Sequence, residues 1–147
     1  MEQAASTGVD NFLTAPDFLF LDMKDSANGS YHPVPCDFTI NGGTPDIVTY
    51  GGFRIPAKDA GGKNIVKYVF NISRYVQKII TNKRVNAVLR LWAPDYVNIF
   101  PGYLDECNIG INPISIPMNR VTNGRVKLVG GNTLPNRLRL RIVYSRI

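Results

Sequence analysis

The chain has 147 residues, of which 44% are hydrophobic and 19% charged; this fits one globular domain with a real core and excludes an intrinsically disordered chain. No apolar run approaches the roughly 18 residues that a transmembrane helix needs. The net charge is +6, but residues 1–106 hold ten basic and eleven acidic side chains, whereas residues 107–147 hold seven basic and no acidic ones. The basic character therefore belongs to the C-terminal segment, which permits an anionic partner without requiring one.

The chain begins with small, polar, non-periodic residues, and we expect residues 1–16 to form a flexible lead-in to a single domain over residues 17–147. The apolar stretch DFLFLDM at 17–23 predicts a buried strand, and Asn28-Gly29 in the loop after it is a strong turn signal. The later strand candidates are bounded by Gly, Pro, Asn and Asp, which favour turns. These candidates lie at residues 36–40, 47–53, 65–70, 86–92, 124–130 and 137–145.

One segment breaks the strand pattern. Between residues 72 and 82, apolar side chains recur at spacings of three and four, which predicts an amphipathic helix of about three turns. Asn71 or Ser73 is expected to supply the N-cap oxygen. A single helix among short strands is typical of an all-β architecture. The predicted fold is therefore mostly β, an antiparallel β-sandwich of jelly-roll-like form with one short amphipathic helix near residues 72–82.

The C-terminal strand carries arginines at alternate positions, and alternate residues of a strand share a face. Pairing of residues 125–129 with this strand would extend the face to five cations. Two interpretations stay open: an ordinary solvated strand face, or a surface for an anionic polymer. Pairing with acids such as Asp17 and Asp22 is also open, and nucleic acid is the least favoured partner because no recognition motif accompanies the cations. The basic face comprises Arg125, Lys127, Arg137, Arg139 and Arg141.

Residues 92–103 (WAPDYVNIFPGY) place four aromatic side chains in a segment that also contains Pro and Gly. Exposed rings offer flat apolar faces suited to sugars, peptide side chains or a protein partner. The candidate ligand-binding residues are Trp92, Tyr96, Phe100 and Tyr103. The alternative is that Trp92 and Phe100 fill one end of the core, which would leave Tyr96 and Tyr103 as the surface contacts.

Residues typical of catalysis or metal binding are sparse. The one histidine, His32, has no neighbouring Ser or Cys motif, and we expect no enzymatic activity, no cofactor and no metal site. Two cysteines, Cys36 and Cys107, are well separated in the sequence. They form either a disulfide that closes a long loop or two separate thiols.

The segments KYVFNISRYVQKIITN, LRLWAPD and GRVKLVGGNTLPNRLRLRIVYSRI resemble the C-terminal portion of an uncharacterised, domain-of-unknown-function family of Bacteroidetes cell-surface lipoproteins. The similarity is closest in the C-terminal part of the chain, and the helix between strands is similar to an element of carbohydrate-binding-module-like jelly rolls. The family carries an N-terminal lipid-attachment cysteine, whereas Cys36 is internal and preceded by HPVP. Membrane attachment would therefore depend on a lipid anchor that is missing here.

The resemblance implies an extracytoplasmic module at the outer-membrane surface or in the periplasm. Together with the aromatic segment, it favours a non-enzymatic binding or accessory module that contacts glycan or an outer-membrane protein. The alternative function is binding of an anionic polymer by the basic face.

Overall fold

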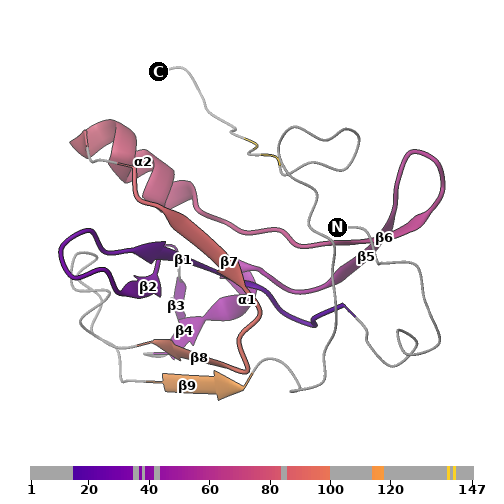
Figure 1. The fold of residues 1–147 in the computed structure, drawn as a ribbon, viewed down its shortest axis with the longest axis horizontal. Helices are drawn as coiled ribbons and strands as arrows, with labels where there is room; N and C mark the ends of the chain where they lie inside the picture. The colour runs from indigo at the N-terminus through magenta and orange to yellow at the C-terminus, as the bar shows by residue number, and fades with distance from the viewer. Residues whose placement is uncertain are drawn as a thin grey trace.

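The structure is a computed structural model and describes residues 15–34, 37, 39–41, 44–83, 86–99, 114–117, 139 and 141. Its regular elements are mainly short strands in antiparallel sheets, together with two helices (Figure 1). The largest sheet has the order β2-β1-β7, with β1 (Phe20–Lys24) between β2 (Tyr31–Pro33) and β7 (Leu89–Trp92). The other strands form three pairs: β3 (Thr39–Asn41) with β4 (Thr44–Asp46), β5 (Ile55–Lys58) with β6 (Asn64–Lys67), and β8 (Tyr96–Ile99) with β9 (Ile114–Pro117).

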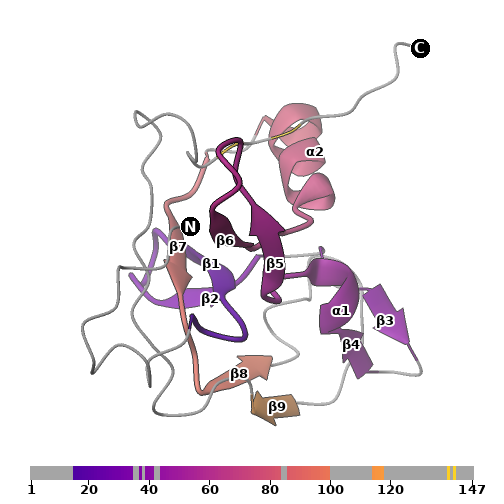
Figure 2. The ribbon, with the colours of Figure 1, turned by 90° about the vertical axis from the view of Figure 1, so that its right-hand side faces the viewer.

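The two helices are α1 (Ile47–Tyr50) and α2 (Ser73–Asn82). In both ribbon views α2 lies toward the top and the β8–β9 pair at the bottom, with α1 at a height between them (Figures 1 and 2). The expected mostly-β, antiparallel character is confirmed in the described part of the chain, and so is the helix near residues 72–82.

The expectation of one helix and of a strand at residues 47–53 is wrong, because residues 47–50 form the short helix α1. Its N-cap is Asp46, whose carboxylate accepts hydrogen bonds from the backbone N–H groups of Val48 (2.9 Å) and Thr49 (3.4 Å). The β-branched residues at 47–49 favour a strand by propensity. The Asp46 cap satisfies N–H groups that the first helical turn would otherwise leave without partners, and this outweighs the propensity.

The expected N-cap of α2 is also wrong. Asn71 accepts bonds only from Ser73, through its backbone N–H (3.2 Å) and hydroxyl (2.7 Å). The N–H groups of Arg74 and Tyr75 instead donate to Asp37, one to each carboxylate oxygen, both at 2.8 Å. The buried Asp37, which precedes β3, therefore caps α2, although α2 begins more than thirty residues later in the chain. Burial raises the pKa of Asp37, while the two backbone N–H groups and the positive charges of Arg74 and Lys78 act in the opposite direction.

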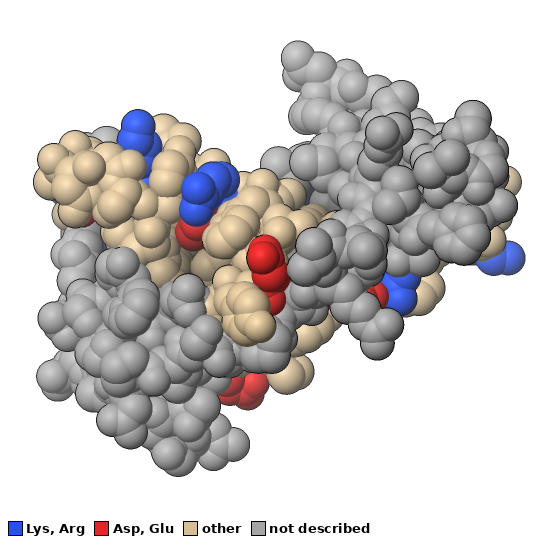
Figure 3. Space-filling view, turned by 60° about the horizontal axis from the view of Figure 1, so that its bottom comes forward, with Lys and Arg blue, Asp and Glu red and all other residues tan. Residues whose placement is uncertain are grey.

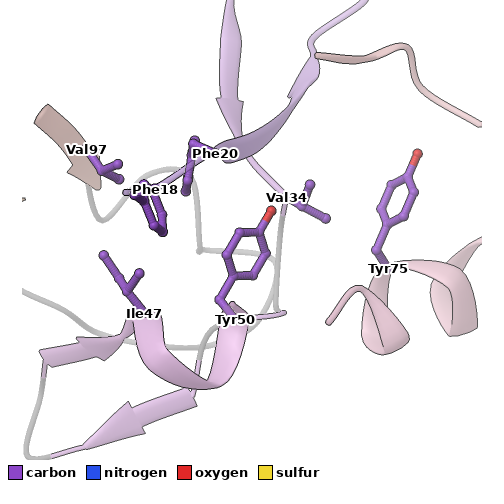
Figure 4. Packing of buried hydrophobic residues seen from close by; sticks show 7 residues of the cluster. All are labelled: Phe18, Phe20, Val34, Ile47, Tyr50, Tyr75 and Val97. Atoms are coloured by element: carbon purple, nitrogen blue, oxygen red, sulfur yellow. The ribbon is translucent and has the colours of Figure 1, made fainter. Parts of the chain in front are cut away.

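The core joins the sheet to both helices through seven side chains that are almost fully buried. Tyr50 of α1 lies near the centre, with its ring 5.7 Å from that of Phe20, and its hydroxyl donates to the carbonyl of Leu21 (Figure 4). Tyr75 of α2 donates to Asn86 and accepts from the N–H of Ala87, both at 3.0 Å, which ties the helix to the segment leading into β7. The cluster comprises Phe18, Phe20, Val34, Ile47, Tyr50, Tyr75 and Val97.

The chain crosses this core at Gly51 and Gly52, which follow α1 with φ angles of 94° and 93°. The Gly52 carbonyl accepts from the N–H of Leu19, and its own N–H donates to the carbonyl of Val69, both at 2.8 Å. A Cβ on Gly52 would lie 2.2 Å from the Leu19 carbonyl oxygen, and a Cβ on Gly51 would lie 2.2 Å from that of Val69. Only glycine fits here, because the backbone conformation and the close approach of two neighbouring segments both exclude a side chain.

Candidate functional site

The centre of the β2-β1-β7 sheet holds a buried carboxylate. Asp22 lies in the middle of β1 and is only 3% exposed. Its Oδ1 accepts from Arg90 Nε at 3.1 Å, and its Oδ2 accepts from Arg90 Nη2 at 2.5 Å and from Trp92 Nε1 at 3.0 Å. A buried charge is tolerated only when it is paired and hydrogen-bonded, and these three donors meet that requirement. The hydrogen bonds that Arg90 donates to Asp22 raise the pKa of Arg90, which keeps the guanidinium charged.

Two aromatic rings hold the guanidinium of Arg90 in place. Its Cζ lies 3.8 Å from the ring centroid of Tyr31 and 4.9 Å from that of Trp92. Both distances are within the range of cation–π attraction. We call the group Tyr31, Arg90 and Trp92, with Asp22 beneath it, the aromatic patch.

The strand register explains how these residues meet. Asp22 is directly opposite Arg90 of β7, and Phe20 is opposite Trp92. On the other edge of β1, Lys24 is opposite Tyr31 of β2. Directly opposed residues in an antiparallel sheet project to the same face, so side chains from all three strands lie together around Asp22 and Arg90.

The patch is accessible. Trp92 is 37% exposed and the Arg90 side chain 41%, although Asp22 beneath them is buried. The Asp22 carboxylate already accepts from Arg90 and Trp92, and the rings of the patch are partly open to solvent. Such a surface is suited to stacking against a flat ligand rather than to proton transfer.

The aromatic segment predicted from the sequence is described only in part. Trp92 is 37% exposed and does not belong to the core cluster, so it does not fill one end of the core. Tyr96, at the start of β8, is 58% exposed. Phe100 and Tyr103 lie outside the described residues.

The basic face is described at two positions, Arg139 and Arg141, and both are exposed. The remaining three cations, Arg125, Lys127 and Arg137, lie outside the described residues. Of the acids considered as partners, Asp22 is paired with Arg90, and Asp17 forms an exposed ion pair with Arg54 at 3.1 Å. On the face shown in Figure 3, the Lys and Arg side chains of the described residues stand apart from one another.

Cys36 and Cys107 also lie outside the described residues, so both alternatives, a disulfide and two separate thiols, remain open. Within the described ranges, no three His, Cys, Asp or Glu side chains gather as a metal site would require. Neither of the two described helices has the length and apolar character needed to cross a bilayer.

Three residues of the aromatic patch were not predicted from the sequence: Asp22, Arg90 and Tyr31. A signal was present, because Asp22 interrupts an apolar strand and a charge at such a position needs a partner of opposite charge. The partner could not be chosen without the register, since many basic residues qualify. Tyr31 lies in the segment after residues 17–23 that the sequence pattern predicts to be a loop.

No protein-family model, no curated protein and no solved structure matches the chain.

Proposed function

We propose that the chain is a non-enzymatic binding module that takes glycan ligands on the aromatic patch. The observation that carries the proposal is the fixed orientation of the partly exposed Trp92 ring, whose Nε1 donates to Asp22 and whose face is approached by Arg90. A ring held in place before binding loses little conformational freedom when a ligand stacks on it. Sugar rings present apolar C–H faces that suit such a surface, while their hydroxyl groups stay hydrated at the edge.

Tyr96 is the second proposed contact. It follows Trp92 after a three-residue connection that contains the buried Pro94, and its ring is 58% exposed. Tyrosine offers a large contact area with a polar tip, which makes it effective at binding surfaces. The two rings provide more than one position at which an extended sugar chain is contacted.

We further propose that the module is part of a cell-surface lipoprotein that lies beside outer-membrane proteins. Its proposed fold is an antiparallel β-sandwich of jelly-roll-like form. The support is the resemblance described above, whose segments include α2, β7 and Trp92. An outer-membrane protein would then be a partner in addition to glycan. Crosslinking in the native membrane followed by identification of the recovered proteins tests this part; recovery of the chain alone in a soluble fraction contradicts it.

A glycan array tests the binding proposal. Trp92→Ala should weaken any detected binding at least about tenfold, which corresponds to about 1.4 kcal/mol, because it removes the stacking surface. Tyr96→Ala should weaken it by a smaller factor. Val69→Ala serves as the control, since Val69 is 60% exposed on a different part of the chain and should leave binding unchanged.

The folded state of each variant is checked by circular dichroism before binding is compared. If no glycan binds the wild-type protein, or if Trp92→Ala binds as the wild type does, the proposed function is wrong.

The alternative function is binding of an anionic polymer by the basic face. The observation in its favour is that Arg139 and Arg141 are both exposed. It predicts an affinity that falls steeply with salt and a loss in the Arg139→Gln/Arg141→Gln variant. An affinity independent of salt rejects it.

A further inference from the structure

We propose that the aromatic patch selects sugars that carry a carboxylate or sulfate group, and that Arg90 binds this group. This inference rests on the proposed glycan-binding function and adds the chemical class of the ligand. It follows from the hydrogen-bond donors of Arg90 that Asp22 leaves unused.

Arginine has five N–H donors in one plane. Asp22 accepts from Nε and from Nη2 of Arg90, which occupies one edge of the guanidinium. The two N–H groups of Nη1 and the second one of Nη2 remain, and the planar geometry directs them away from Asp22. Among the described residues no acceptor contacts these three groups, and the side chain is 41% exposed.

The unused edge has the form that an oxyanion requires. Two parallel N–H groups at the end of a guanidinium match the two oxygens of a carboxylate or sulfate, and such paired bonds are among the strongest in proteins. The edge is also fixed before binding, because Asp22 holds one side of the group and the rings of Tyr31 and Trp92 flank it. A sugar stacked on Trp92 would therefore have its acidic substituent within reach of Arg90.

The charge of the surroundings supports the same ligand class. Asp22 neutralises Arg90, so the pair alone is neutral. Lys24, which is exposed and directly opposite Tyr31 in the register, adds one positive charge beside this pair. One additional cation is enough to favour a ligand with a single acidic group.

A nucleic acid is a less suitable ligand for this surface. Binding along a phosphate backbone uses a row of cations. The three strands of this sheet contain only Lys24 and Arg90 as arginine or lysine residues. The spacing of charges thus fits an isolated acidic group better than a continuous polyanion.

The test compares oligogalacturonate with the same oligosaccharide after carboxyl reduction, by isothermal titration at low salt. The wild-type protein should bind the acidic form at least about tenfold more tightly. An oligothymidylate of similar charge is included as a polyanion without sugar carboxylates. Raising the salt concentration should reduce the preference, because Arg90 and Lys24 are partly exposed to screening.

The informative variant is Asp22→Asn/Arg90→Gln, which replaces the buried ion pair with two neutral amides and avoids leaving a lone buried charge. It should lose the preference and bind the acidic and the neutral form of the sugar with equal affinity. Asp17→Asn/Arg54→Gln removes the exposed ion pair elsewhere and should keep the tenfold preference. Trp92→Ala should weaken binding of both forms.

The outcomes separate this inference from the function on which it rests. Equal binding of the acidic and neutral forms by the wild type, or a preference that survives in Asp22→Asn/Arg90→Gln, overturns the role of Arg90 and leaves glycan binding intact. Oligothymidylate binding as tightly as oligogalacturonate overturns selection of acidic sugars in favour of general polyanion binding. Absence of binding to every sugar form overturns both proposals.

Discussion

Replacing Gly52 with alanine tests the close packing where the chain crosses the core. The new Cβ would lie 2.2 Å from the Leu19 carbonyl oxygen, 2.9 Å from Cε1 of Phe70 and 3.0 Å from Cε2 of Phe18. The Leu19 oxygen is backbone, so relief requires the strand leading into β1 to move. Overpacking of this kind costs about 1–3 kcal/mol, in addition to the strain of alanine at a φ of 93°.

Gly62 offers a matched control, because its φ is 80° but no atom lies within 4 Å of the Cβ position. Gly62→Ala therefore introduces the conformational strain without the clash. Gly61→Ala introduces no strain from a positive φ, and its Cβ would meet only the Asp59 side chain, at 3.4 Å. We expect Gly52→Ala to lose about 1–3 kcal/mol more unfolding free energy than Gly62→Ala. Urea denaturation followed by circular dichroism measures the difference. Equal losses in the two variants would show that the approach of Leu19 to Gly52 is not as close as described.

Three further predictions concern ionisable groups. Asp22→Ala should cost about 2–3 kcal/mol because it leaves Arg90 without its partner, whereas Asp17→Ala, at an exposed ion pair, should cost about 1 kcal/mol or less in the same urea assay; similar losses contradict the distinction. Because the pKa of Asp37 is raised in the folded state, the wild type should gain unfolding free energy relative to Asp37→Asn as the pH falls through the folded-state pKa toward the ordinary value of 3.8. A stability difference between the two proteins that stays constant with pH would contradict this prediction. Burial raises the pKa of Tyr68 to about 12, and its hydroxyl donates to the Pro16 carbonyl at 2.5 Å. Tyr68→Phe should lose about 1 kcal/mol at neutral pH, and the gap should close as the pH rises from about 10 through 12, as alkaline unfolding would reveal.

The elements predicted well were those with a strong local pattern. The apolar run at 17–23 contains most of β1 and the Phe18–Phe53 bridge that precedes it. The segment at 72–82, with apolar residues three and four apart, contains α2. β7 also lies inside its predicted segment. In each case the burial of one face depends on residues a few positions apart, which a sequence displays directly.

The elements that were missed depend on residues far apart or on a single capping side chain. β8 and β9 pair across a segment containing several prolines, and neither strand lies in a segment that the sequence pattern predicts as a strand. α1 depends on the Asp46 carboxylate rather than on the propensities of its own residues. The aromatic patch depends on which strand lies beside β1, and only Trp92 among its members was predicted.

The capping of α2 by Asp37 has a consequence for how the protein folds. Because no neighbouring side chain accepts from the N–H groups of Arg74 and Tyr75, and Asn71 reaches only that of Ser73, a peptide of residues 70–83 should show little helicity in water. The helix becomes stable only when a residue 37 positions before Arg74 has docked, so its formation is coupled to closure of a long loop. The amide hydrogens of Arg74 and Tyr75 should then exchange with solvent only when that docking is lost, together with the amides of the strands rather than with those of a fraying helix end.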